Sequence, residues 1–153
     1  MRYGFLILLV GVVACRPAAD QPAADTTASV APPAPAPLAL ADLAGTWDMK
    51  GTAEGSDSVL VTFELMATAD TTGWMQHFAG RDPIPMRVIA VAGDSVVTET
   101  GPYESVLRRG VQVSTHSVMR LQDGRLVGLT TARYTTTGPD SVVRIRTEGT
   151  RRP

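Results

Sequence analysis

Residues 111–135 read VQVSTHSVMRLQDGRLVGLTTARYT, two β-strand patterns separated by Asp123-Gly124. An Asp-Gly pair between such runs is the strongest short signal for a β-hairpin, because a two-residue type I′ turn needs positive φ at both positions. The turn also sets the register, so that Leu121 pairs with Leu126. The other face of the hairpin then carries Gln112, His116, Arg120, Arg125 and Arg133.

Similar patterns fill the chain from residue 42 onward. Runs rich in Val, Thr, Ile and Leu are separated by Gly, Asp and Pro clusters, which is typical of all-β sandwiches and barrels. The predicted strands cover residues 45–52, 58–68, 74–78, 85–92, 95–100, 111–121, 125–135 and 141–147. Residues 103–107 form either a ninth short strand or an ordered loop. No stretch has a helical period of useful length.

Each predicted strand buries one face. Apolar residues occupy every second position from 59 to 65, and Val143 and Ile145 alternate with arginines near the carboxyl end. About eight antiparallel strands joined by short loops predict a small up-and-down β-barrel, a closed structure that leaves no exposed edge. A β-sandwich is the alternative.

The amino-terminal residues have the layout of a secretory signal. Arg2 precedes an uncharged, apolar run at 5–13 that is far shorter than the roughly 20 residues of a membrane-spanning helix. Val12-Val13-Ala14-Cys15 resembles the lipobox of bacterial lipoproteins. The resemblance implies that residues 1–14 are a signal peptide and that Cys15 carries the acyl chains that attach the protein to a membrane. The alternative is an ordinary secretory signal with a cysteine at its cleavage site.

Residues 15–41 form the predicted linker. Of the 26 residues at 16–41, ten are alanine and six are proline, a composition that favours a disordered, polyproline-like stalk. A proline-rich ligand for a partner domain is the alternative. Arg16, rather than aspartate, follows Cys15, so the lipoprotein resemblance implies a cell-envelope protein of the outer rather than the inner membrane. Its domain would face the periplasm or the exterior.

The domain at 42–153 opens with Gly45-Thr46-Trp47. This resembles the Gly-x-Trp opening of the calycins, the lipocalin and avidin group. The resemblance implies a minimal lipocalin-like barrel in which Trp47 plugs one end and a basic residue near the carboxyl end stacks on it. Arg146 and Arg151 are the leading candidates for that basic residue, and Arg144 stays open. Of these, Arg146 is taken with Gly45 and Trp47 as the barrel-closing motif. The resemblance further implies a small, apolar ligand at the open end of the barrel.

No residue pattern indicates catalysis. The net charge of −1 gives no reason to expect nucleic acid as a partner. His77 and His116 have no neighbours at metal-ligand spacing, and the candidate acids Glu64, Glu99 and Glu104 stand singly. We therefore expect no enzyme, no cofactor and no metal. Two functions remain: a barrel that binds a small ligand, or a structural or protein-interaction module of the envelope with a filled interior.

Overall fold

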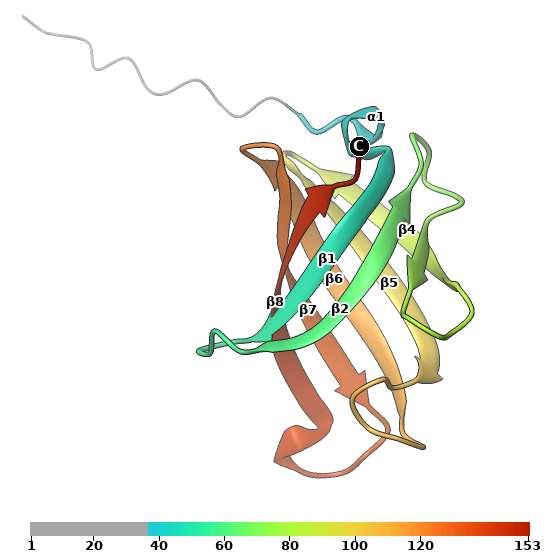
Figure 1. The fold of residues 1–153 in the computed structure, drawn as a ribbon, viewed down its shortest axis with the longest axis vertical. Helices are drawn as coiled ribbons and strands as arrows, with labels where there is room; N and C mark the ends of the chain where they lie inside the picture. The colour runs from blue at the N-terminus through green and yellow to red at the C-terminus, as the bar shows by residue number, and fades with distance from the viewer. Residues whose placement is uncertain (1–36) are drawn as a thin grey trace, which may run out of the picture. The chain divides into compact units, whose positions relative to one another are not determined.

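A computed structural model of the chain describes residues 37–153. The predicted signal peptide, Cys15 and most of the predicted linker lie outside these residues. Within them, eight antiparallel strands follow one another in sequence order and close into a barrel (Figure 1). The predicted up-and-down barrel is therefore confirmed, and the β-sandwich is not the fold.

Short loops join the strands, and almost no helix interrupts them. The elements are α1 (Leu40–Leu43), β1 (Gly45–Ala53), β2 (Val59–Ala67), β3 (Met75–His77), β4 (Ile84–Ala92), β5 (Ser95–Glu104), β6 (Gln112–Gln122), β7 (Arg125–Tyr134), η1 (Pro139–Ser141) and β8 (Val142–Arg151). Tyr103 and Glu104 belong to the end of β5 and residues 105–107 to the loop that follows, so residues 103–107 do not form a ninth strand. Strand β8 runs on to Arg151, beyond its predicted end at residue 147.

The hairpin of β6 and β7 forms as predicted. Asp123 and Gly124 have φ values of 51° and 75°, the left-handed conformations that a type I′ turn requires. Leu121 pairs with Leu126, and the pairing continues without a bulge to Val113 and Tyr134. This uninterrupted register fixes which side chains of the two strands enter the barrel.

Two apolar clusters fill the two ends of the barrel interior. The larger one lies beneath α1 at what we call the capped end; its buried members are Leu43, Trp47, Met49, Leu65, Ala67, Trp74, Met86, Val96, Met119 and Leu126. The smaller one lies at the opposite, open end, where the β5–β6 and β7–β8 loops emerge (Figure 1); its buried members are Val113, Ala132, Tyr134 and Ile145. The core is therefore in two parts.

The folded part begins before the predicted boundary at residue 42. Leu38 and Leu40 pack against the larger cluster, and the Leu38 N–H donates to the Gly93 carbonyl at 2.8 Å. Leucines at these positions bring apolar surface into the Ala/Pro-rich segment, and that surface anchors its last residues to the barrel. None of the helices in residues 37–153 has the length and apolar character needed to span a membrane.

Candidate functional site

The capped end is closed by Trp47. Its ring is fully buried, and its Nε1–H donates to the Leu43 carbonyl of α1 at 2.8 Å. The Arg151 guanidinium lies 4.5 Å above the ring centroid and also donates to the carbonyls of Ala44 and Asp42. One arginine thus ties the last strand to α1 over the indole of the first strand.

Glycine is required at position 45 for two reasons, its backbone conformation and the atoms that surround it. Its φ of 134° is one that residues with a side chain rarely adopt. A Cβ there would also lie 3.2 Å from Arg151 Nη1. The glycine of the Gly-x-Trp stretch therefore makes room for the guanidinium that covers the tryptophan.

Arg146 does not stack on Trp47, so the choice of Arg146 as the barrel-closing arginine is wrong. In the β1–β8 register Trp47 pairs with Arg151, whereas Arg146 pairs with Thr52. Arg146 projects from the outer face, where it donates to the Ser56 carbonyl at 2.5 Å and lies 3.4 Å from the Asp57 carboxylate. Arg144 also faces outward, toward Glu54 at 4.0 Å.

Between the two apolar clusters, the interior carries a set of polar side chains that we call the hydroxyl belt. All of them occupy inward positions in the alternation of their strands. The belt consists of Gln76 on β3, Thr98 and Thr100 on β5, Thr115 and Ser117 on β6, Thr130 on β7 and Thr147 on β8. The belt was not predicted from the sequence; its only signal there is threonine at positions where the alternation demands a buried residue.

Only some of the polar groups in the hydroxyl belt form hydrogen bonds. Ser117 Oγ and Thr130 Oγ1 lie 2.8 Å apart, and Gln76 Nε2 donates to the Tyr103 hydroxyl at 3.4 Å. Three further hydroxyls are buried without a partner among residues 37–153: those of Thr98, Thr100 and Thr147. Buried polar groups in proteins are nearly always paired, so these three hydroxyls are exceptions that call for an explanation.

A cavity of about 50 Å³ reaches the belt from the open end. Its wall is apolar and aromatic toward the opening, where the Phe78 ring lies 5.6 Å from Phe63 and 5.9 Å from Tyr103, centroid to centroid. No Asp, Glu, Lys, Arg or His is among the described residues that line it. At about 10–15 Å³ for each water this is room for a few waters, far below the roughly 300–1,000 Å³ of a drug-sized pocket. The cavity fits a very small molecule, or the end of a slender one.

The β5–β6 loop forms part of the cavity wall through Val106 and Leu107. At the start of this loop, Arg81 donates to the Glu104 carbonyl at 2.5 Å. Arg108, within the loop, contacts the end of β7 and η1.

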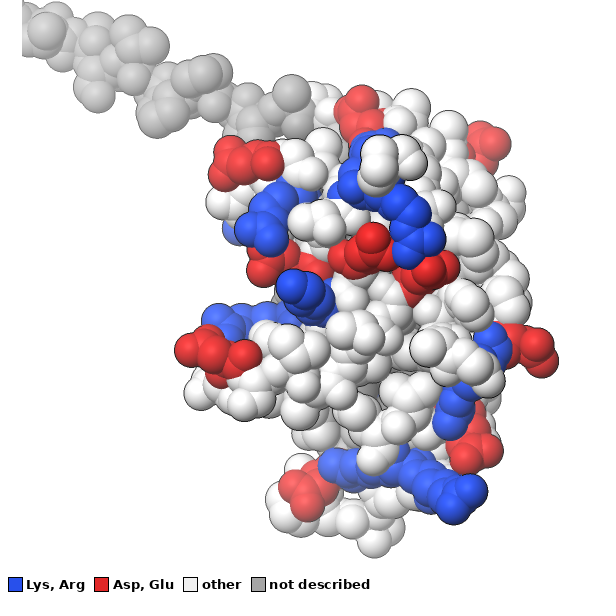
Figure 2. Space-filling model, in the orientation of Figure 1, with Lys and Arg blue, Asp and Glu red and all other residues white. Residues whose placement is uncertain are grey.

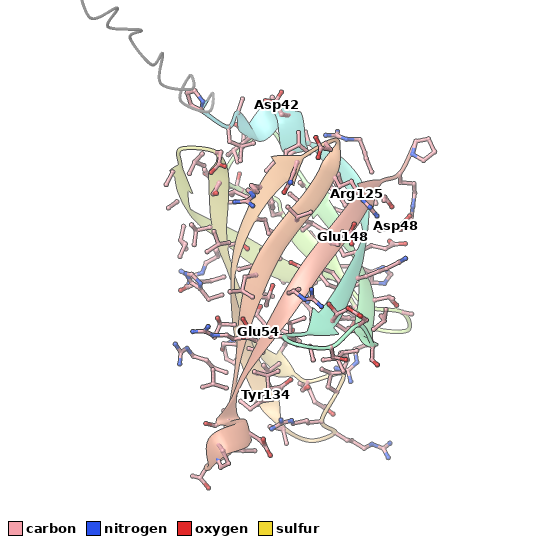
Figure 3. All side chains as sticks on the ribbon, turned by 90° about the vertical axis from the view of Figure 1, so that its left-hand side faces the viewer. Asp42, Asp48, Glu54, Arg125, Tyr134 and Glu148 are labelled. Atoms are coloured by element: carbon pink, nitrogen blue, oxygen red, sulfur yellow. The ribbon has the colours of Figure 1, made fainter. Side chains whose placement is uncertain are left out.

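The Arg108 guanidinium lies 4.0 Å over the Tyr134 ring and donates to the Asp140 carbonyl at 2.8 Å. Figure 3 shows Tyr134 near the end of β7, close to η1. The opening is therefore bordered by a loop with defined attachments on two sides.

The ionisable candidates from the sequence lie on the outer face. His77 Nδ1 is 3.5 Å from Glu64, which also accepts from Arg152 at 2.6 Å; hydrogen bonding by Arg152, with a smaller effect of His77, lowers the pKa of Glu64. Glu99 pairs with Arg87 at 2.7 Å. Within the described range no three His, Cys, Asp or Glu side chains are placed to hold a metal ion.

The two other candidates lie apart from that cluster. Glu104 accepts from the Gly110 N–H at 3.1 Å, and His116 lies on the exterior of β6. Figure 2 shows acidic and basic side chains next to one another on the face in view, which agrees with the ion pairs along the strands. These groups are best understood as a solvated surface, not as a site.

No protein-family model, curated protein or solved structure matches the chain. The lipobox and the lipocalin-like identity therefore stay predictions. The geometry of the barrel carries the functional argument.

Proposed function

We propose that this chain is a lipid-anchored protein of the bacterial cell envelope whose barrel binds a small ligand, predominantly apolar, through its open end. The cavity behind the aromatic opening is the observation that carries the proposal. One end of the barrel is sealed by Trp47, while the other leads past Phe78 and Tyr103 to the buried hydroxyl of Thr147, which has no partner among residues 37–153. Such a combination of apolar walls with a few convergent polar groups is typical of small-molecule sites.

The size of the cavity limits how the ligand binds. With about 50 Å³ of free volume, only a terminal group enters the barrel, and any remaining part of the molecule lies along the opening. The methionines Met86 and Met119 line the same cavity. Their unbranched side chains adapt to new shapes more readily than branched ones, so a ligand can enlarge the space at modest cost.

Native mass spectrometry of the protein purified from its own host tests ligand binding. We expect a bound small molecule in the native protein. It should be lost in Ala132→Leu, because Ala132 is buried and lines the cavity, so that the larger side chain fills it. The matched control is Thr131→Leu, the neighbouring residue, which faces the exterior groove. Absence of any adduct from the native protein, or an adduct equally retained by Ala132→Leu, contradicts the proposed site.

Lipidation is tested separately. A clickable fatty acid supplied to cells should label the protein, and Cys15→Ala should abolish the label and release the protein from membranes, because two or three acyl chains are needed for stable anchoring. Wild-type protein that never takes up the label would contradict the anchor. Density fractionation of the membranes then decides between outer and inner membrane.

The alternative function, an interaction module of the envelope, is favoured by a different observation. A groove of about 870 Å³ crosses the exterior of β6, β7 and β8, and its floor includes Val118 and Leu129, which are 40% and 37% exposed. Apolar side chains grouped on an outer sheet face are a common feature of protein-binding surfaces. Cross-linking in the host tests this function: a protein partner captured by wild type but lost in Val118→Lys, with no ligand in the barrel, would favour the interaction module.

A further inference from the structure

We infer that the ligand is an uncharged molecule whose buried end carries one hydrogen-bonding group, such as an alcohol or a carbonyl, and that Thr147 binds this group. The inference rests on the proposed function and specifies its ligand. Thr147 is 5% exposed, its hydroxyl has no partner among the described residues, and its side chain lines the cavity. Thr98 and Thr100 have equally orphaned hydroxyls, but they are not part of the cavity wall.

The cross-strand neighbours of Thr147 explain its missing partner. Thr147 pairs with Gly51 on β1 and with Gly128 on β7, so neither neighbouring strand supplies a side chain at this level. Neither glycine can readily be replaced. A Cβ at Gly51 would lie 2.8 Å from Val61 Cγ1, and one at Gly128 would collide with the Val118 carbonyl. The register therefore leaves the Thr147 hydroxyl with no side chain to pair with on either neighbouring strand.

The lining excludes a charged group at the buried end. No described cationic or anionic side chain lines the cavity, and the polar atoms available there are hydroxyls and the Gln76 amide. Transfer of an unpaired ionised group into such surroundings is far more costly than transfer of a neutral polar group. An amine or a carboxylate would therefore bind poorly in its charged form.

A wholly apolar end is disfavoured for the opposite reason. It would leave the Thr147 hydroxyl as unpaired as it is without a ligand, so this end of the molecule would gain no hydrogen bond. An alcohol both donates and accepts, and a carbonyl accepts from the threonine. Either group satisfies Thr147 while the rest of the molecule contacts the apolar wall.

The experiment compares four six-carbon probes that differ only at one end: 1-hexanol, hexane, hexanoate and hexylammonium. The protein is the full chain carrying Cys15→Ser, so that no acyl chain of its own competes for the barrel. Dissociation constants come from calorimetry at pH 7. We expect 1-hexanol to bind about 100-fold more tightly than either charged probe, since each factor of ten corresponds to about 1.4 kcal/mol.

The role of Thr147 is read from the ratio of hexanol affinity to hexane affinity. Thr147→Val keeps the shape and removes the hydroxyl, so this ratio should fall about tenfold, the effect of one hydrogen bond. Thr147→Ser should restore it in large part, and Thr98→Val, an equally buried residue that is not part of the cavity wall, should leave it unchanged.

The outcomes separate the inference from the function on which it rests. Charged probes that bind as tightly as hexanol, or a ratio that Thr147→Val does not change, overturn the inference while ligand binding stands. If none of the four probes binds to the folded protein, ligand binding in the barrel is itself contradicted. Thermal unfolding of each variant, followed by circular dichroism, establishes that the folded barrel was tested.

Discussion

Arg151 and Trp47 face each other across the seam where the last strand of the barrel meets the first. They are direct partners in the β1–β8 register, with the guanidinium 4.5 Å above the indole centroid. The same guanidinium binds two carbonyls at the end of α1, and the indole binds a third. One contact thus links the β1–β8 closure to the cap over the interior.

Removal of the Trp47 ring should weaken the domain severely. The side chain is fully buried in the larger cluster, and truncation of a buried tryptophan typically costs about 3–5 kcal/mol, a large share of the roughly 5–15 kcal/mol that stabilises a domain. Arg151→Ala should cost less, about 1–2 kcal/mol, because the residue is exposed and loses a cation–π contact and hydrogen bonds that water partly replaces. Urea unfolding measures both.

A double-mutant cycle tests whether the two residues act together. Trp47→Phe with Arg151→Ala should show a coupling of about 0.5–1 kcal/mol, in the range measured for exposed cation–π pairs. Arg146→Ala is the matched control and should show none, since Arg146 pairs with Asp57 on the outer face. Equal coupling of both arginines to Trp47 would contradict the register.

Two inward glycines should respond differently to alanine. A Cβ at Gly128 would strike the Val118 backbone carbonyl, whereas one at Gly149 would meet the end of the Met49 side chain. Backbone in the middle of a barrel cannot move aside, but methionine can change rotamer. Gly149→Ala should therefore cost about 1–3 kcal/mol, the usual cost of overpacking, and Gly128→Ala clearly more. Equal urea midpoints for the two variants would show that the barrel adapts at both sites.

Acid should remove the contribution that the Glu64 carboxylate makes to the stability of the folded protein. Its hydrogen bond from Arg152 lowers its pKa in the folded protein, so the carboxylate adds stability above its unfolded pKa of about 4.3, and this contribution is lost as the pH falls through the lower folded pKa. Glu64→Gln should therefore unfold at a lower temperature than wild type at pH 7, with the difference closing below about pH 4. In an Arg152→Gln background the substitution should have little effect at either pH. A difference that is constant with pH would point to packing instead.

The β5–β6 loop should loosen when its arginine contacts are removed. Arg108→Ala takes away the contact with Tyr134 and the hydrogen bond to Asp140, so amide exchange should accelerate in residues 105–111. Hydrogen-exchange mass spectrometry measures this, with the β6–β7 hairpin as an internal reference. Arg133→Ala, on the outer face of β7, is the control. Unchanged exchange in the loop would mean that its backbone bonds, such as Ser105 N–H to the Val111 carbonyl, are sufficient.

The barrel was predictable from sequence because local signals agreed with one another. The Asp123-Gly124 turn set one hairpin register, and two-residue alternation assigned faces to the strands on either side. The end of β8 was missed because the inward positions after Ile145 are Thr147 and Gly149, which break its apolar alternation. That shortfall led directly to the wrong arginine, since only a strand that reaches Arg151 brings a basic residue opposite Trp47.

The hydroxyl belt could not be predicted for a different reason. Threonine favours strands and occurs on both buried and exposed faces, so Thr98 and Thr147 look the same in sequence as solvent-facing threonines. Their burial depends on which strands close the barrel, a relationship between distant parts of the chain. Whether their hydroxyls find partners depends further on the cross-strand neighbour, as the two glycines beside Thr147 illustrate.

The belt itself yields a prediction in which two similar substitutions have opposite effects. Thr98→Val removes a buried hydroxyl that has no partner among residues 37–153. It should leave stability unchanged or raise it, because valine has nearly the same shape and no polar atom to desolvate. Thr130→Val removes one half of the hydrogen bond to Ser117 and leaves the other hydroxyl buried alone. That should cost about 1–3 kcal/mol, the penalty of an unsatisfied buried group.

The double variant Ser117→Ala/Thr130→Val supplies the control, since it removes both partners and should recover part of the loss through the missing desolvation penalty. Urea midpoints at constant m-value measure all four proteins, including wild type. If Thr98→Val destabilises as much as Thr130→Val, the Thr98 hydroxyl has a partner in solution, and ordered water in the barrel is the candidate. A hydroxyl kept at a net cost to stability is expected where it serves binding, and of the three unpaired hydroxyls among residues 37–153 only that of Thr147 lines the cavity.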